Sequence, residues 1–228
     1  MPKGKDYEYE IIKSPAYTLL KVDLEREQRM KAEAGAMVSM SPNIAIETKM
    51  QGGAFGALKR KALGGESFFQ NIFKSENGPG ELTLAPGYPG DVERISLDGD
   101  HWFLQGGAFL SSNVDIDLDT KFQGLKGFVS REGLFFLKAE GYGDLFISAF
   151  GALYEYDLNG ELIVDTGHLV GFHGGIEYDV KRVGGLKSTF LSGEGLILKL
   201  KGQGKVYLQT RNPTAFASWL TPFLPSKR

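Results

Sequence analysis

The fold is decided by the stretch Gly141-Tyr142-Gly143-Asp144-Leu145-Phe146-Ile147, which has two counterparts elsewhere in the chain. They are Gly78-Pro79-Gly80-Glu81-Leu82-Thr83-Leu84 and Gly202-Gln203-Gly204-Lys205-Val206-Tyr207-Leu208. Each copy places Gly-x-Gly directly before a strand pattern, and because this turn recurs three times we interpret it as hairpin geometry rather than as a ligand loop.

Small-residue turns that lead into apolar strands precede each copy, at residues 34–38, 107–110 and 166–170. A pattern that recurs at a fixed period predicts stacked copies of one supersecondary unit. We therefore predict a single domain of three internal repeats, over residues 30–98, 99–160 and 161–211, followed by a helical tail over 212–228.

Strand signals dominate between these copies. Leu20, Val22 and Leu24 alternate with polar positions, and so do Ile116 and Leu118. Alternation with a period of two places one set of side chains on a core face, and the 31 glycines supply frequent bends. The sequence predicts an all-β fold, a pseudo-threefold repeated β-sandwich or β-roll of short strands, with a short C-terminal helix.

The composition excludes several classes of function. The 228 residues are 42% hydrophobic and 24% charged, carry a net charge of −2 and include no cysteine. Thiolate nucleophiles, disulfides and cysteine-ligated metals are thus excluded. Residues 1–10 resemble neither a signal peptide nor a transit peptide, and no apolar run approaches the roughly 18 residues of a membrane span. We expect a soluble, cytoplasmic protein.

Basic, glycine-rich segments are the sharpest candidate for binding. Residues 52–65 carry three adjacent cations beside apolar side chains, and related basic elements recur at 121–127 and 181–187. If the copies are related by a pseudo-threefold axis, these segments share one side of the molecule. The candidate binding residues are Lys59, Arg60, Lys61, Lys126, Lys181, Arg182 and Lys187. The alternative is three solvated loops whose apolar side chains cover the ends of the sheets.

The C-terminal segment reads as a short amphipathic helix. Asn212 is a favourable N-cap, Pro213 suits the first helical position, and Pro222 should end the helix near Thr221. An apolar face recurs at helical spacing through Phe216, Trp219, Leu220, Phe223 and Leu224. Because large exposed apolar patches are rare on monomers, we expect this face to pack on the domain's own core.

The repeats resemble a known family, the altered-inheritance-of-mitochondria family. The strings that carry the resemblance span residues 34–40, 46–50, 58–70, 78–86, 122–127, 164–168, 181–187 and 208–212. The resemblance implies a β-fold like that of the trp RNA-binding attenuation protein, and it implies no catalytic residue. Eukaryotic members are associated with organisation of the mitochondrial inner membrane, a role not carried over because residues 1–10 lack the pattern of a transit peptide.

Catalytic and metal-binding patterns are weak. Asp115, Asp117 and Asp119 form a row that could hold a hard divalent cation, although a solvated outer face explains it more simply. His168 and His173 do not have the spacing of a zinc site, and the sequence contains no phosphate-binding loop. We therefore predict no enzymatic activity and no cofactor.

These patterns leave three classes of function open. The first is a self-associating scaffold or binding protein, a homo-oligomer that docks on a membrane surface or an acidic protein partner through its basic loops. The second is an RNA-binding module, against which the net charge of −2 weighs. The third is a protein that binds a divalent cation through the aspartate row.

Overall fold

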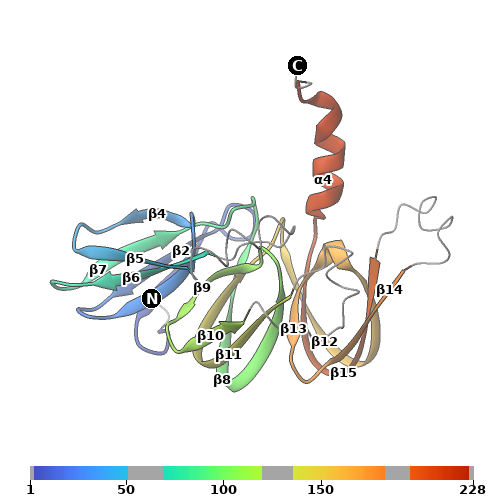
Figure 1. Ribbon diagram of the computed structural model, residues 1–228, viewed down its shortest axis with the longest axis horizontal. Helices are drawn as coiled ribbons and strands as arrows, with labels where there is room; N and C mark the ends of the chain where they lie inside the picture. Colours follow the sequence, from blue (N-terminus) through green and yellow to red (C-terminus); the bar gives the residue numbers. More distant parts are fainter. Residues whose placement is uncertain (1–2, 51–68, 120–135, 183–195, 226–228) are drawn as a thin grey trace.

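Antiparallel strands make up nearly all of the regular structure in the computed structural model, which describes residues 3–50, 69–119, 136–182 and 196–225 (Figure 1). The predicted all-β fold with one short C-terminal helix is confirmed. In chain order the strands are β1 (Glu8–Ile12), β2 (Leu19–Leu24), β3 (Arg29–Glu33), β4 (Met37–Met40), β5 (Ile44–Met50), β6 (Phe69–Ser75), β7 (Gly80–Leu84), β8 (Val92–Gln105), β9 (Phe109–Asn113), β10 (Ile116–Asp119), β11 (Phe136–Ser148), β12 (Leu153–Asp165), β13 (Leu169–His173), β14 (Glu177–Arg182) and β15 (Leu196–Gln209).

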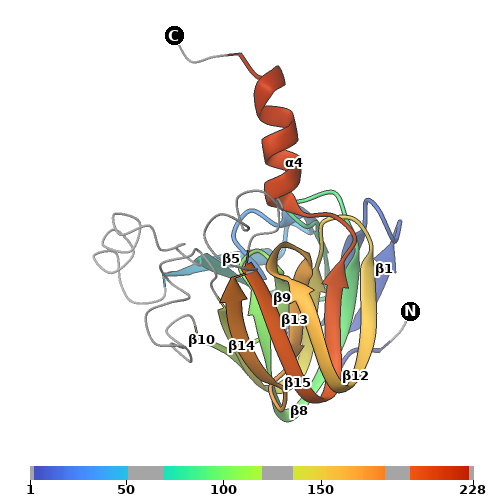
Figure 2. The ribbon, with the colours of Figure 1, turned by 90° about the vertical axis from the view of Figure 1, so that its right-hand side faces the viewer.

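The described strands form two sheets. The smaller sheet has four strands in the order β1-β2-β7-β4. The larger has eleven strands, nine of them in the order β12-β15-β13-β8-β11-β9-β3-β6-β5, while β10 pairs with β11 and β14 with β15. Viewed from the end that β12 and β15 form, the long strands curve so that this part of the body resembles a rolled sheet (Figure 2).

The predicted alternation places the core correctly. Leu20, Val22 and Leu24 of β2 are at most 1% exposed, and on β10 the apolar Ile116 and Leu118 are buried while Asp117 faces solvent. Burying one such side chain contributes about 1.5–3 kcal/mol, so the alternating face supplies much of the driving force for folding.

The Gly-x-Gly stretches bend strands instead of closing hairpins, so our prediction of hairpin turns is wrong for the two later copies. Gly141 and Gly143 lie inside β11, and Gly202 and Gly204 lie inside β15. All four have φ between +131° and +149°, backbone values that glycine adopts without a side-chain clash. The chain therefore bends without reversing direction.

Strand pairing explains why the bend is needed. One edge of β11 pairs along its length with β8, while its other edge pairs first with β10 and then with β9. In the same way β15 pairs with β12 on one edge, and with β14 and then β13 on the other. In each strand the two glycines stand where one short partner gives way to the next. The pseudo-threefold relation between the repeats stays a prediction.

The C-terminal helix forms where the sequence predicts it. α4 spans Pro213–Leu220 and is followed by the 3-10 turn η2 (Thr221–Phe223), while a second turn, η1 (Thr166–His168), follows β12. The side chain of Asn212 accepts hydrogen bonds from the N–H groups of Thr214 (2.9 Å) and Ala215 (3.1 Å), which satisfies two of the free donors at the helix N-terminus.

The expectation that the apolar face of this helix packs on the core is wrong. α4 stands away from the sheets in both ribbon views, and neither α4 nor η2 contains a buried residue (Figures 1 and 2). Because the helix axis points away from the body, side chains beyond the first turn are out of reach of the core. Among the described residues, no helix combines the length and apolar character that crossing a bilayer requires.

Candidate functional site

Most of the predicted basic residues lie outside the described part of the chain: Lys59, Arg60, Lys61, Lys126 and Lys187. Lys181 and Arg182 form the end of β14. The Lys181 side chain is exposed, and its Nζ lies 3.3 Å from the Asp179 carboxylate on the same strand. A neighbouring acid therefore offsets the charge of Lys181.

The aspartate row lies along a strand that turns its apolar side chains inward. Asp115 precedes β10, and Asp117 and Asp119 belong to it. Asp115 and Asp117 are exposed, and Asp119 is half-buried. Within the described ranges, no three His, Asp or Glu side chains converge closely enough to hold a metal ion. The arrangement corresponds to the outer face of a sheet.

The histidines make local contacts. Nδ1 of His168 lies 2.8 Å from the Gln209 carbonyl oxygen, and Nε2 of His173 lies 3.4 Å from the Asp100 carboxylate. Partial burial lowers the pKa of His101, and Lys138 lowers it further. His168 lies in the turn η1 and His173 ends β13, whereas His101 lies inside β8.

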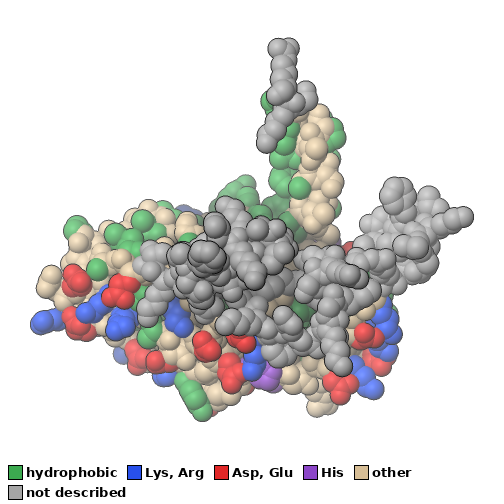
Figure 3. All heavy atoms as spheres, viewed as in Figure 1, with side chains coloured by type: hydrophobic (Ala, Val, Ile, Leu, Met, Phe, Trp, Pro, Cys, Tyr) green, Lys and Arg blue, Asp and Glu red, His purple; other side chains and the backbone are tan. Residues whose placement is uncertain are grey.

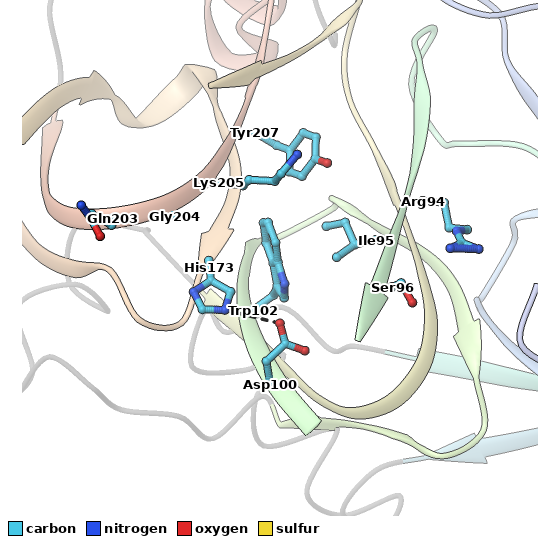
Figure 4. A pocket seen from close by; sticks show the side chains of 10 residues that line it. All are labelled: Arg94, Ile95, Ser96, Asp100, Trp102, His173, Gln203, Gly204, Lys205 and Tyr207. Atoms are coloured by element: carbon cyan, nitrogen blue, oxygen red, sulfur yellow. Dashed lines mark ion pairs between the residues drawn. The ribbon is translucent and has the colours of Figure 1, made fainter. Parts of the chain in front are cut away.

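A hollow of about 530 Å³ lies between β8, β13 and β15 (Figure 4). Trp102 lies within it, with its ring centroid 5.8 Å from that of His173 and 5.6 Å from that of Tyr207. Nε1 of Trp102 is buried, and no residue in the described part of the chain accepts a hydrogen bond from it. The hollow is lined by Arg94, Ile95, Ser96, Asp100, Trp102, His173, Gln203, Gly204, Lys205 and Tyr207.

The ionic groups of this hollow are engaged with the protein itself. Arg94 lies 3.3 Å from Asp144, and Lys205 pairs with Glu155. Tyr207 donates a hydrogen bond of 2.7 Å to Glu155. Burial raises the pKa of the Tyr207 phenol, and the hydrogen bond to the Glu155 carboxylate raises it further. One unpaired indole donor beside satisfied ion pairs does not define a ligand, so the hollow is the weaker candidate site.

The stronger candidate is the apolar surface of α4 and η2, which we call the C-terminal aromatic ladder. It comprises Phe216, Trp219 and Phe223, which are 46%, 62% and 71% exposed. Successive ring centroids are 5.8 Å and 5.5 Å apart, so the rings form one connected surface. Leu224 extends it and is 56% exposed.

The ladder carries no formal charge. Residues 212–225 include no Asp, Glu, Lys or Arg, and the sequence then continues with Ser226, Lys227 and Arg228. The helical spacing of the apolar residues predicted that they share one face of the helix. Spacing alone does not predict what that face packs against. The missing charged face was the overlooked signal, because a short helix that packs on its own domain usually turns a charged face to water.

The structure thus defines an all-β protein from whose body an uncharged helix projects. The family model described as mitochondrial biogenesis AIM24 matches residues 9–211, so the chain belongs to this family and the resemblance seen in the sequence is confirmed. The matched residues end directly before Asn212, and α4 lies beyond them.

Two relatives from Streptococcus pyogenes are similar over nearly the whole chain. An uncharacterized protein of serotype M6 is 30% identical over 227 residues, which cover 96% of this chain and 91% of the relative. The crystal structure of another protein from this species matches with a TM-score of 0.79 at 28% identity, covering 96% of this chain and all of the other. These relatives support the fold and carry no assigned activity.

Proposed function

We propose that this chain is a non-enzymatic binding protein that docks onto a lipid surface through the C-terminal aromatic ladder. The observation that carries the proposal is the exposure of Phe216, Trp219 and Phe223 on a helix that leaves the body (Figure 1). Aromatic side chains on a short helix favour the boundary between lipid headgroups and acyl chains.

The energetics favour partition of the ladder. Moving one large apolar side chain out of water contributes about 1.5–3 kcal/mol, so three rings and Leu224 together offer several kcal/mol. The exposed fractions reduce this gain, as does the lost freedom of the bound protein. A reversible, peripheral association is therefore the expected mode.

The basic segments supply a second attraction. Each cation near an anionic surface contributes about 1 kcal/mol, and Lys59, Arg60 and Lys61 are adjacent in the sequence. We expect anionic vesicles to bind more tightly than neutral ones, with a preference that salt weakens.

Vesicle flotation tests the proposal. Wild type should float with phosphatidylcholine vesicles that contain phosphatidylglycerol, and the double variant Trp219→Ser/Phe223→Ser should stay in the protein fraction. Tyr142→Ser is the matched control, because Tyr142 is 56% exposed on the bend of β11. Equal flotation of the double variant and wild type would contradict the proposal.

RNA binding is less well supported by the described surface. Cations on β15 face acids on β12: Lys199 lies 2.9 Å from Glu161, and Lys205 pairs with Glu155. Nucleic acid needs a stripe of one sign of charge, whereas these cations are already paired. A filter-binding curve that stays flat with mixed RNA is the expected result.

Self-association is a second function, which one observation favours. β12 is an edge strand of thirteen residues that pairs only with β15 in the described structure, and Tyr154 and Ile163 on it are more than half exposed. Open edges favour pairing with another chain. Light scattering should report an oligomer for wild type, and a smaller species for Ile163→Lys.

A further inference from the structure

An uncharged surface continues from the base of α4 across the body. It consists of residues 36–38, 85–90 and 149–152, which we call the apolar rim; these segments contain no Asp, Glu, Lys or Arg. In Figure 3 the hydrophobic side chains gather along the upper border, over β4 and around the base of α4, whereas charged side chains lie mainly below.

Backbone contacts join the first two segments of the rim. The N–H of Ala85 donates to the Ala36 carbonyl at 2.8 Å, and Met37 of β4 lies opposite Leu84 of β7. A β-bulge follows, because Ser39 pairs with the next residue of β7 and Val38 has no opposite. Met37 and Val38 are consequently exposed, at 39% and 54%.

A second set of contacts joins the rim to the ladder. Gly90 and Gly151 form an isolated parallel bridge, and the Gly151 N–H donates to the Pro89 carbonyl at 3.0 Å. The rings of Tyr88 and Phe150 have centroids 5.8 Å apart, and Phe150 meets Phe216 at 5.2 Å. Backbone contacts therefore join the segment of Val38 to residues 85–90, and ring contacts then lead from Tyr88 through the buried Phe150 to Phe216 and the ladder.

We propose that the apolar rim makes a second contact with lipid. Met37, Val38 and Tyr88 would touch the same membrane surface that the ladder enters. This inference rests on the proposed function and extends it to the body of the protein. Docking at two places fixes the orientation of the body on the membrane. Docking through the helix alone would leave that orientation free.

Charge and shape favour lipid over a second copy of the chain. Backbone hydrogen bonds tie two charged residues into this surface. The Arg211 N–H donates to the Phe150 carbonyl at 3.2 Å, and the Asp91 N–H donates to the Gly151 carbonyl at 2.9 Å. Asp91 is half-buried and its carboxylate accepts hydrogen bonds from the Ser14 and Thr18 hydroxyls, whereas Arg211 is exposed, so the more exposed of the two charges is the cation. A cation beside an apolar surface suits anionic headgroups. In addition, α4 projects from the rim, so a rigid partner would need a matching recess, whereas a fluid lipid layer accepts the projection.

The experiment compares Val38→Asp with Tyr142→Asp by flotation, using vesicles of three parts phosphatidylcholine and one part phosphatidylglycerol. The two side chains are 54% and 56% exposed, and Tyr142 lies in β11 where its register with β8 shifts. The paired strands β8 and β11 curve along the border of the body opposite α4 (Figure 1). Val38→Asp should weaken partition about tenfold, because the variant loses an apolar side chain and must desolvate a charge. Tyr142→Asp should change it less than twofold.

Each outcome decides a different claim. If wild type binds and Val38→Asp binds equally well, the rim makes no lipid contact and the proposed function of the ladder stands. If wild type fails to bind these vesicles, both proposals are overturned. If Val38→Asp converts a dimer to a monomer in light scattering without changing vesicle binding, the rim joins two copies of the chain. Tyr88→Ser repeats the test should Val38→Asp fail to fold, which circular dichroism reports.

Discussion

The ring of Phe216 meets the ring of Phe150 at a centroid distance of 5.2 Å and an interplanar angle of 64°, and this contact joins α4 to the body. Phe150 is 8% exposed and belongs to the body, whereas Phe216 is 46% exposed and belongs to the helix. Beyond Phe216 the ladder leaves the body, so the pair acts as the base of a projecting element.

Removing this base should loosen the helix without unfolding the body. In Phe150→Ala the ring contact with Phe216 is lost, and we expect the NMR order parameters of α4 to fall while those of β8 and β11 stay unchanged. Phe223→Ala is the matched control, because it removes a ring at the far end. Unchanged α4 order in Phe150→Ala would show that another contact holds the helix.

The N-cap should stabilise α4 locally. Asn212→Ala removes the acceptor for the N–H groups of Thr214 and Ala215, at a cost of about 1 kcal/mol to the helix. Because α4 buries no residue, the melting temperature of the whole protein should hardly change. Faster hydrogen exchange at Thr214 and Ala215 is the expected signature, and a large drop in melting temperature would mean that α4 supports the body.

Two glycines of one loop should respond very differently to alanine. A Cβ on Gly90 would lie 1.7 Å from the Ala149 carbonyl oxygen, whereas a Cβ on Gly87 meets nothing within 4 Å. Gly90→Ala must push the two loops of the rim apart, and we expect a loss of several kcal/mol in the free energy of unfolding. Gly87→Ala should stay within about 0.5 kcal/mol of wild type in urea denaturation.

The buried carboxylate of Asp144 should matter more than the exposed ion pairs. Asp144 is 2% exposed, lies 3.3 Å from Arg94 and accepts the Lys5 N–H at 2.8 Å. Asp144→Ala leaves these partners unsatisfied and should cost about 3 kcal/mol in chemical denaturation. Lys21→Ala, which breaks a more exposed pair with Glu81, should cost at most about 1 kcal/mol. Similar costs for the two variants would contradict this ranking.

Local patterns predicted the local features of the fold. The burial of Leu20, Val22 and Leu24 follows from a period of two, and the start of α4 follows from Asn212 and Pro213. These signals are reliable because they depend on backbone geometry within a few residues.

Features that depend on distant partners were not predictable in this way. Gly141 and Gly143 indicate unusual backbone angles in the sequence. Only the pairing of β11 with β10 and then with β9 determines that the strand bends there and continues. Similarly, the spacing of Phe216 and Trp219 shows that they share a face, yet the direction in which α4 leaves β15 determines that this face is exposed.

Tryptophan fluorescence tests the central claim most directly, because the two tryptophans report on different places: Trp219 is 62% exposed on the ladder, and Trp102 is 4% exposed in the body. On adding phosphatidylcholine vesicles with phosphatidylglycerol, we expect the emission of wild type to shift to shorter wavelength and brominated acyl chains to quench it. Trp219→Phe, which keeps only Trp102, should show neither change. An emission spectrum of wild type that neither shifts nor is quenched at saturating lipid would contradict docking through the ladder.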